Sequence, residues 1–339
     1  IYSFFRLGKA LINEAPIKRL AIADFLCNDT SSLVIEAELP LFADYITNSV
    51  SEKIELVKQH FPEFTLTDVF PFKEDISPEI ERTELLASFF TQPDLFIRVK
   101  SEYLTQLKEK LNTEGIFPSE IGSATLALPI GTKLEKIVPD QKYYQVQDLS
   151  SQATGELFKP EKWDYWWDCC AASGGKSLLL HSLEPTVQLL VSDVRENSLH
   201  NLEERFRDSG IKKYQKKVLD LLQNNDQDLH HYEFDGIILD APCTGSGTWG
   251  RTPEMLYYFD SHKVSYFSKL QKSIATNVVK YLKQGKPLIY ITCSVFKAEN
   301  EDVVDWMLKE LPLKLQRTEV IRGYNHKADT MFAARLIKV

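Results

Sequence analysis

The sequence predicts an α/β fold, with a doubly wound and mostly parallel sheet, over residues 141–339. Short apolar runs alternate there with longer segments of helical period, which is the order expected of a parallel sheet covered by helices. The run 236–239 is too short for a helix and rich in isoleucine, as expected of a buried parallel strand. That run and the run 288–291 both lead into polar residues and a cysteine, at the edge where open α/β sheets build their sites.

The elements of this part are expected to alternate along the chain. The expected strands span residues 163–169, 187–192, 214–219, 236–239 and 288–291. The expected helices span residues 174–183, 196–209, 264–282 and 298–311. Two final extended pieces, at 313–320 and 330–339, can form a closing hairpin.

Two smaller regions are expected before this part. Residues 1–75 are expected to form a helical N-terminal region, because apolar side chains recur there with the period of a helix. Residues 76–140 are expected to form a small α+β module, with strands at 95–99 and 124–128 and a helix at 101–111. Residues 141–339 then form the third domain.

Composition limits the class of protein. With 43% hydrophobic and 26% charged residues the chain resembles an ordinary globular protein, and no apolar run approaches the roughly 18 residues of a membrane span. The five cysteines include no C-x-x-C pair and no zinc spacing, so we expect a cytoplasmic monomer without metal and without a membrane partner. The net charge of −8 weighs slightly against a nucleic-acid partner, although local patches can still bind phosphate.

The segment 168–177, D-C-C-A-A-S-G-G-K-S, connects a predicted strand to a predicted helix. Its small residues let the backbone approach a ligand, and the start of the helix presents free N–H groups. A P-loop is excluded because Cys170 stands where that motif needs glycine, and a full G-x-G-x-x-G is also missing. Asp193 ends the next strand, where an acid can bind the ribose of a nucleoside cofactor, and Asp220 ends the third strand. A plain tight turn and helix caps are the alternatives.

Two cysteines follow two apolar strands. Cys243 comes just after Asp240, and Cys293 comes just after the strand 288–291. Because these strands are expected to be neighbours, an acid and two thiols should meet at one edge of the sheet. The alternative is that both are inert core thiols, as most buried cysteines are. Arg251, after the Cys243 loop, could contact phosphate or serve as an ion-pair partner.

With these residues in place, the chain resembles the RNA cytosine-5 methyltransferases of the RsmB/NOP/Sun (Fmu) group, most closely the bacterial 16S rRNA enzymes of the RsmB type. The resemblance runs from about residue 90 to the C-terminus, and the order of D-A-P-C and T-C-S is its most specific feature. The other segments that carry it are P-D-L-F-I-R-V-K, V-Q-D-L-S-S-Q, D-C-C-A-A-S-G-G-K, R-T-P-E and F-A-A-R-L-I-K. The resemblance implies a Rossmann-like methyltransferase domain, preceded by a small RRM-like RNA-binding module and a helical region.

The resemblance also implies a cofactor, S-adenosyl-L-methionine, and a role for each matching position. Asp193 would bind the cofactor ribose, Asp220 would lie near its adenine, and Asp240 would line the same site. Cys293 would add to C6 of cytosine, Cys243 would assist product release, and Asp240 would act at N3 of the ring. The loop that would hold the cofactor consists of Cys170, Ala171, Ala172, Ser173, Gly174, Gly175 and Lys176.

Three positions depart from the family pattern without removing a catalytic group. Ser173 replaces the proline of the loop, Ser198 replaces an arginine, and Lys100 replaces an asparagine. The loss of the proline should loosen the turn while keeping its N–H donors.

The resemblance implies RNA as the partner, with ribosomal RNA as the first candidate. The basic residues expected to contact its phosphates are Arg98, Lys100, Lys159, Lys162 and Arg251. For each of them the alternative is a solvated surface charge or an ion pair.

The implied function is transfer of a methyl group from S-adenosyl-L-methionine to C5 of a cytosine in RNA through a covalent adduct of cysteine with C6. The alternatives are a tRNA substrate and a catalytically silent RNA-binding factor of ribosome assembly, which the intact set of Asp240, Cys243 and Cys293 argues against. A DNA cytosine-5 methyltransferase would use Cys243 as its nucleophile and would leave Cys293 without a role.

Overall fold

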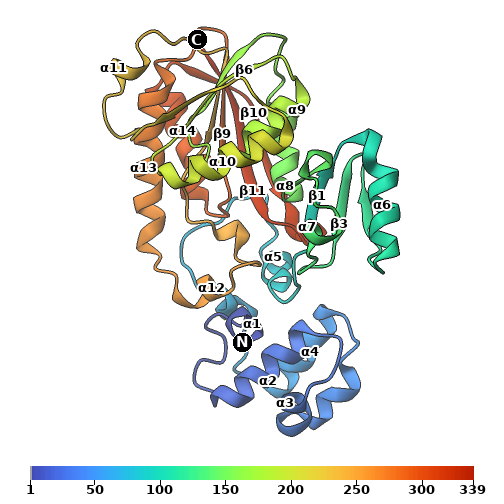
Figure 1. Ribbon diagram of the computed structural model, residues 1–339. Coiled ribbons are helices and arrows are strands. Elements are labelled where there is room, and N and C mark those ends of the chain that lie inside the picture. Colours follow the sequence, from blue (N-terminus) through green and yellow to red (C-terminus); the bar gives the residue numbers. More distant parts are fainter. Residues whose placement is uncertain (1) are drawn as a thin grey trace.

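The structure is a computed structural model that describes residues 2–339, apart from the side chain of Gln141. Figure 1 shows a large sheet with helices packed against it, a small sheet module beside it and a group of N-terminal helices below. Within the described residues, no helix combines the length and the apolar character that a membrane crossing requires.

The large sheet has seven strands in the order β10-β11-β9-β8-β5-β6-β7. The five strands from β9 to β7 run parallel, and β11 lies antiparallel to both of its neighbours. This arrangement confirms the predicted doubly wound, mostly parallel sheet with a closing hairpin. The strands are β5 (Tyr165–Asp168), β6 (Gln188–Asp193), β7 (Gln215–Val218), β8 (Gly236–Asp240), β9 (Pro287–Thr292), β10 (Leu313–Arg322) and β11 (Thr330–Lys338).

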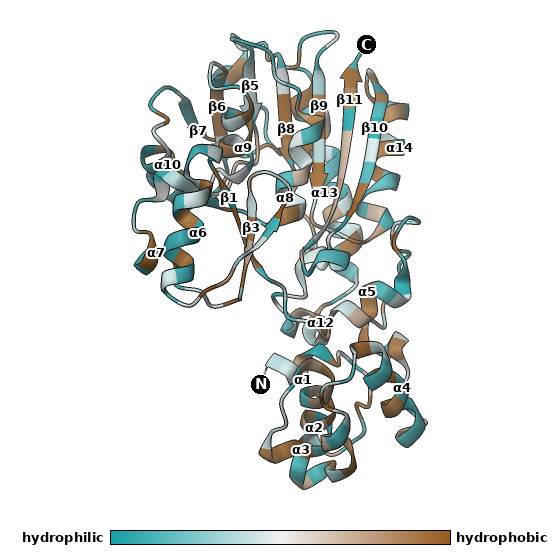
Figure 2. Ribbon diagram, turned by 90° about the vertical axis from the view of Figure 1, so that its right-hand side faces the viewer, coloured by the Kyte–Doolittle hydropathy of each residue, from teal (hydrophilic) through white to brown (hydrophobic). Residues whose placement is uncertain are grey.

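Helices cover both faces of this sheet. On one face, α9 (Gly175–Leu183) and α10 (Glu196–Ser209) pack against alternate strand residues such as Ile238. On the other face, α13 (His262–Val279) and α14 (Glu301–Glu310) belong to the core that holds Ile237 and Leu239. Consecutive residues of β8 face opposite helical layers, and both layers are apolar. The sequence of this strand is therefore a continuous apolar run. Figure 2 shows this hydrophobic centre, with more polar strands toward the edges of the sheet.

The small sheet has four antiparallel strands in the order β2-β3-β1-β4. Its helix α6 (Leu104–Thr113) buries Leu107 and Leu111 against one face of the sheet. Two of its strands have only three residues each, too few for a visible alternation, and they were not predicted. Strand β4 lies beyond residue 140, so the small sheet extends past the predicted boundary. The strands are β1 (Leu95–Val99), β2 (Ser119–Ile121), β3 (Thr125–Leu128) and β4 (Tyr144–Val146), with the short helix α7 (Leu134–Ile137) beside them.

The N-terminal region is helical, although its first helix is shorter than the apolar period indicates. Helix α1 (Tyr2–Arg6) ends before Gly8, which has a φ of +53°. A Cβ atom at Gly8 would lie 2.0 Å from the carbonyl oxygen of Val69, so the close approach of two segments requires glycine there. The further helices of this region are α2 (Pro16–Cys27), α3 (Leu33–Glu38) and α4 (Val50–His60), and α5 (Arg82–Ser88) follows before the small sheet.

The N-terminal region packs against the loops that follow β8 and β9. The side chain of Arg6 donates a hydrogen bond to the carbonyl oxygen of Gly250 (2.8 Å). The backbone N–H of Ser77 donates one to the carbonyl oxygen of Val295 (2.8 Å). The ring of Phe70 contacts those of Trp249 and Phe296. The remaining short helices are α8 (Leu149–Ala153), α11 (Asp226–Leu229) and α12 (Glu254–Tyr258), and α12 lies next to α1 in Figure 1.

Candidate active site

The candidate site lies at the carboxyl edge of the parallel strands. Strands β5, β6 and β8 end in Asp168, Asp193 and Asp240, and β9 ends one residue before Cys293. Chain connections from β5 and β8 leave toward opposite sides of the sheet, so a topological switch point lies between these two strands. Such a switch point is where open α/β sheets leave a crevice for a ligand.

The two predicted thiols meet at this edge. The Sγ atoms of Cys243 and Cys293 lie 3.3 Å apart, and their strands β8 and β9 are paired in parallel, with Asp240 opposite Ile291. Two backbone bonds join the loops: Ala241 N–H donates to Ile291 O (2.8 Å), and Gly247 N–H donates to Cys293 O (2.9 Å). The contact with Cys293 and burial raise the pKa of the Cys243 thiol well above its usual value.

A buried glutamate, Glu299, holds the two cysteine loops together. Its carboxylate accepts hydrogen bonds from the N–H and hydroxyl of Thr244 (2.9 and 2.6 Å) and from the hydroxyl of Ser294 (2.5 Å). Thr244 follows Cys243 and Ser294 follows Cys293, so one side chain fixes the residue after each thiol. Gln271 of α13 donates a further bond to it (3.2 Å), and burial raises the pKa of Glu299.

Sequence reasoning did not assign Glu299 a role. The predicted helix 298–311 includes Glu299, and an acid near the start of a helix is expected to be solvent-exposed. The structure instead places Glu299 at the end of a short 3-10 turn, Lys297–Glu299. The sequence does contain one indication of this role. Thr244 and Ser294 follow the two cysteines, and their hydroxyl groups need a hydrogen-bond acceptor when they are buried.

Asp240 forms an ion pair with the lysine of the loop. Lys176 Nζ lies 2.9 Å from Asp240 Oδ2 and also donates to the hydroxyl of Ser151 (2.9 Å). Lys176 is buried and Asp240 is half-buried. The pair therefore places a positive and a negative group side by side at the end of β8, next to the loop that carries Cys243.

The loop after β5 is shaped by close packing. Gly174 has a φ of +82°, and a Cβ atom there would lie 2.9 Å from the side chain of Leu202. Next to it, Arg205 of α10 donates hydrogen bonds to the carbonyl and the hydroxyl of Ser173 (3.0 and 3.1 Å). The serine that replaces the family's proline is thus fixed by a neighbouring helix. Ser177 donates to the buried carboxylate of Asp168 (2.7 Å), which ties the first turn of α9 to β5.

The predicted loop fits a nucleoside cofactor. The first N–H groups of α9 have no acceptor within the helix, and a side chain added at Gly175 would enter open space. At the end of the neighbouring strand β6, Asp193 accepts from the N–H groups of Ala172 (3.0 Å) and Arg195 (2.8 Å). Oδ1 also accepts from Arg195 Nε (3.2 Å), so the carboxylate is held at the mouth of the loop and a lone pair of Oδ2 is left for a ribose hydroxyl.

Two further predicted cofactor contacts are placed differently from Asp193. Asp220 is exposed and its carboxylate accepts from Leu222 N–H (3.0 Å) within a turn, and it does not cap a helix, since α11 begins only at Asp226. Cys170 is half-buried next to Ala171, whose N–H donates to Ser192 O (2.9 Å) and joins the loop to β6.

One predicted RNA contact is corrected by the structure. Arg251 donates to the carboxylates of Asp148 (2.7 Å) and Asp329 (2.9 Å) and to the carbonyl of Asp94 (3.0 Å). With two carboxylates on its guanidinium, Arg251 is an ion-pair partner within the fold, which favours the ion-pair alternative over a phosphate contact.

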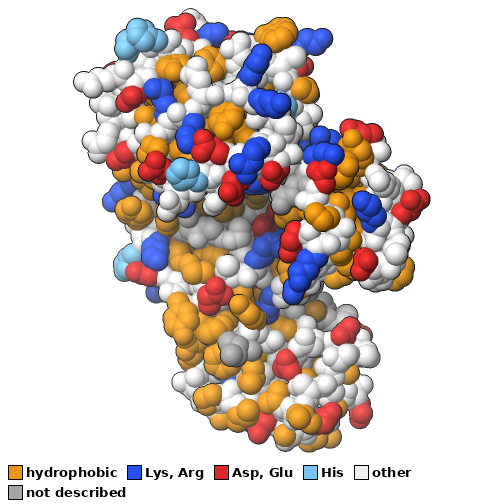
Figure 3. Space-filling view, in the orientation of Figure 1, with side chains coloured by type: hydrophobic (Ala, Val, Ile, Leu, Met, Phe, Trp, Pro, Cys, Tyr) orange, Lys and Arg blue, Asp and Glu red, His pale blue; other side chains and the backbone are white. Residues whose placement is uncertain are grey.

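The other predicted RNA contacts lie away from the carboxyl edge. Lys159 and Lys162 are exposed and precede β5, so they stand at the amino end of the parallel strands. Arg98 lies between the small sheet and α9, where it donates a hydrogen bond to the hydroxyl of Ser182 (2.5 Å). Lys100, two residues further along the chain, is exposed. Figure 3 shows Lys and Arg side chains at this junction, mixed with acidic ones.

Solved methyltransferases share this fold. A methyltransferase homolog protein from Pyrococcus horikoshii is 20% identical and has a TM-score of 0.63, over 76% of this chain and 90% of that one. NSun6 from Pyrococcus horikoshii, solved with SFG, is 18% identical with a TM-score of 0.67, over 84% and 97% of the two chains. At these identities the likeness shows the fold, which is Rossmann-like.

The family follows from sequence comparison. The family model for the 16S rRNA methyltransferases RsmB/F matches residues 156–337, so the chain belongs to this family. The ribosomal RNA small subunit methyltransferase B of Shewanella oneidensis is 30% identical over 204 residues, which are 57% of this chain and 47% of that protein. The chain spans about half the length of this curated relative. Membership of the family confirms the predicted resemblance and the predicted cofactor, S-adenosyl-L-methionine.

Proposed function

We propose that the chain methylates C5 of a cytosine in RNA, ribosomal RNA first, through a covalent adduct between Cys293 and C6 of the base. The observation that carries the proposal is the pair of thiols, 3.3 Å apart at the ends of two neighbouring parallel strands. A reaction in which one sulfur bonds to a ring carbon and a second assists its departure needs both sulfur atoms beside the same base.

The residues of the edge can activate the ring. C5 of cytosine becomes nucleophilic when a thiolate adds to C6 and turns the ring into an enamine. Addition is helped by a proton or a hydrogen bond at N3, and the pair of Lys176 and Asp240 can supply either there. When bound, S-adenosyl-L-methionine supplies the electrophilic methyl group. The loop after β5 and Asp193 are the residues that would hold it against the base.

The family pattern gives the two thiols unequal roles. Cys293 stands at the T-C-S position, which matches the nucleophile of the family, and Cys243 stands in D-A-P-C. Burial and the contact with Cys293 raise the pKa of the Cys243 thiol, so Cys243 can carry a proton beside the nucleophile. After methyl transfer a base such as water takes the C5 proton, the C5–H electron pair re-forms the double bond between C5 and C6, and the sulfur of Cys293 leaves C6 as a thiolate. Cys243 is close enough to donate a hydrogen bond to this departing sulfur.

The substrate class rests on the family and on accessibility. The family description names 16S rRNA, and the curated relative acts, by its name, on the small-subunit ribosomal RNA. A site at the edge of a sheet reaches C6 only when the base is single-stranded or flipped out of its helix. We therefore propose an unpaired or extruded cytosine of ribosomal RNA as the substrate.

Tritium transfer from labelled S-adenosyl-L-methionine tests this function. Label is expected in cytosine-containing ribosomal RNA, and bisulfite mapping is expected to locate it at C5 of one cytosine. Transfer to tRNA alone would favour the tRNA alternative, and RNA binding without transfer would favour a silent assembly factor.

The cofactor site carries its own prediction. Asp193→Ala is expected to weaken binding of S-adenosyl-L-methionine by about 1–3 kcal/mol, because charged hydrogen bonds to the ribose are lost. In calorimetry the exposed control Asp208→Ala on α10 is expected to bind like the wild type. ATP and NAD are expected not to raise the melting temperature. An unchanged affinity of Asp193→Ala would remove this residue from the site.

A further inference from the structure

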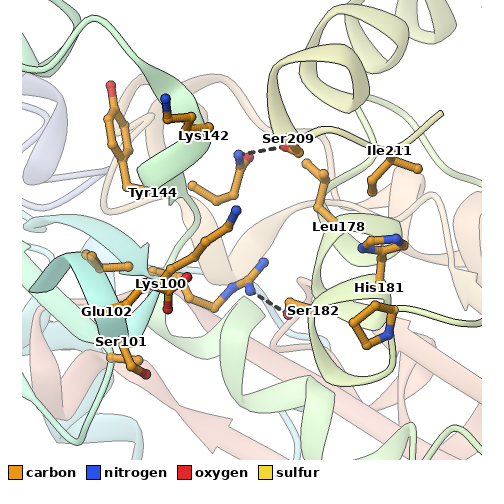
Figure 4. A pocket seen from close by; sticks show the side chains of 15 residues that line it. Lys100, Ser101, Glu102, Lys142, Tyr144, Leu178, His181, Ser182, Ser209 and Ile211 are labelled. Carbon is orange, nitrogen blue, oxygen red and sulfur yellow. Dashed lines mark hydrogen bonds between the residues drawn. The ribbon is translucent and has the colours of Figure 1, made fainter.

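A pocket of about 490 Å³ lies between the small sheet and the methyltransferase fold. Its walls come from β1 and the turn after it, from β4, and from the C-terminal ends of α9 and α10. Figure 4 shows Lys100 reaching toward its centre, with His181 and Ser182 of α9 on the opposite side. A volume of this size is in the range of pockets for small ligands, roughly 300–1,000 Å³.

The pocket does not belong to the candidate active site. Lys176, which pairs with Asp240 at the carboxyl edge, is in the first turn of α9, whereas Ser182 is in the last. At 1.5 Å per residue, this spacing is about 9 Å along the helix. The pocket therefore flanks the far end of α9.

The pocket holds positive charge that has no counterion. Arg98 is half-buried and donates only to neutral acceptors, the hydroxyl of Ser182 (2.5 Å) and the side-chain carbonyl of Gln147 (3.3 Å). Within residues 2–339, no carboxylate lies within ion-pair distance of Arg98 or Lys100. Burial and the neighbouring Arg205 lower the pKa of Arg98 to about 10.

The other titratable groups around the pocket do not neutralise this charge. Burial and Lys100 lower the pKa of His181, so the imidazole is held neutral by its surroundings. Lys142 is paired with Asp140 (2.6 Å) at the rim, and Glu102 is the single carboxylate among the described lining residues. A half-buried cation that has only neutral acceptors lacks a compensating charge, and an anion in the pocket would supply it.

The remaining walls are apolar. Leu178, Pro185 and Ile211 line one side, and Tyr144 lines another. A cationic end beside an apolar wall suits a ligand with a phosphate and a flat ring, which is the make-up of a nucleotide.

We propose that this pocket binds a phosphate-bearing nucleotide, with its phosphate at Arg98 and Lys100 and its base against the apolar wall. The nucleotide is either one unit of the RNA strand, which rests on the proposed function, or a free mononucleotide. Both sources present the same phosphate to the same cations, and the experiment below separates them.

The test uses the full chain and the variants Arg98→Gln and Lys100→Gln. The matched control is Lys309→Gln, an exposed lysine on α14. Binding of a short single-stranded oligoribonucleotide is measured by fluorescence anisotropy between about 50 and about 200 mM salt. The logarithm of the binding constant is plotted against the logarithm of the salt concentration, and each lost phosphate contact is expected to reduce the slope of this plot by roughly 0.7. Melting curves with cytidine monophosphate and with inorganic phosphate give the second readout.

An RNA nucleotide in the pocket predicts weaker oligoribonucleotide binding, about five- to tenfold, and a reduced salt slope in both variants but not in the control. A free mononucleotide predicts that cytidine monophosphate raises the melting temperature of the wild type and the control, but not of the variants, while oligoribonucleotide binding stays equal. Equal binding and equal slopes in all four proteins, with no thermal shift from either small ligand, would overturn the proposal.

Two further measurements keep the outcomes distinct. If Arg98 only bridged Ser182 and Gln147, Arg98→Gln would lower the melting temperature in phosphate-free buffer; with an uncompensated cation we expect it to stay or rise. Lys100 is exposed, so Lys100→Gln decides the proposal should Arg98→Gln unfold. Methyl transfer together with equal salt slopes and no thermal shift from either small ligand would overturn the pocket and leave the proposed function standing. A thermal shift from cytidine monophosphate without any methyl transfer would do the reverse.

Discussion

Replacement of Cys293 by alanine is expected to abolish methyl transfer to RNA, by more than about 10³-fold, as for other enzymes that lose a nucleophile. Without this sulfur no bond to C6 can form, and C5 does not become nucleophilic. The measurement is single-turnover transfer of labelled methyl groups to RNA. Because Cys293 is half-buried and its thiol forms a hydrogen bond only with the other thiol among the described residues, we expect S-adenosyl-L-methionine affinity and melting temperature to stay close to those of the wild type.

A matched control separates chemistry from folding. Cys27 is also half-buried, but it ends α2 in the N-terminal region, so Cys27→Ala is expected to retain activity. Activity of Cys293→Ala together with loss of activity in Cys243→Ala would contradict the assignment, since that pattern is the one expected of a DNA-type enzyme.

Substitution of Glu299 is expected to damage both stability and catalysis. Glu299→Ala leaves the N–H of Thr244 and the hydroxyl of Ser294 without their acceptor, at a cost of about 1–3 kcal/mol in unfolding free energy. The two thiols then lose their common support. A displacement of about 1 Å at a reacting group can cost on the order of 10² in rate.

Chemical denaturation and steady-state kinetics measure the two effects. We expect kcat to fall with little change in the KM for S-adenosyl-L-methionine, because the cofactor loop does not contact Glu299. Glu299→Gln keeps the shape and is expected to fall between alanine and wild type, and the exposed Glu310→Gln at the end of α14 serves as control. Wild-type kcat in a folded Glu299→Ala protein would remove this residue from the support of the site.

The strongly patterned parts of the fold could be predicted from the sequence. The helix α10 has the expected bounds, and the strands β8 and β9 lie side by side as their common ending in cysteine loops indicates. Both strands are buried on two faces, so their apolar runs were unmistakable. The closing hairpin of β10 and β11 was also predicted, although β11 pairs directly with β9 and puts β10 at the edge.

The contacts made between distant segments could not be predicted. Arg251 finds Asp148 and Asp329 at separations of 103 and 78 residues, and no local pattern announces such partners. The same holds for Glu299, whose partners lie in the loops after β8 and β9 and on α13. The division of the chain into domains at residues 75 and 140 stays a prediction, and strand β4 lies beyond the second boundary.

The central claim is that Cys293 forms the bond to the base and Cys243 helps to break it. The most direct test is a denaturing gel of Cys243→Ala incubated with ribosomal RNA and S-adenosyl-L-methionine, beside Cys293→Ala and the double variant. We predict a protein–RNA species that survives denaturation in Cys243→Ala alone, because its adduct forms and methylates but is released slowly. A trapped species in Cys293→Ala, or none in any folded variant, would contradict the account.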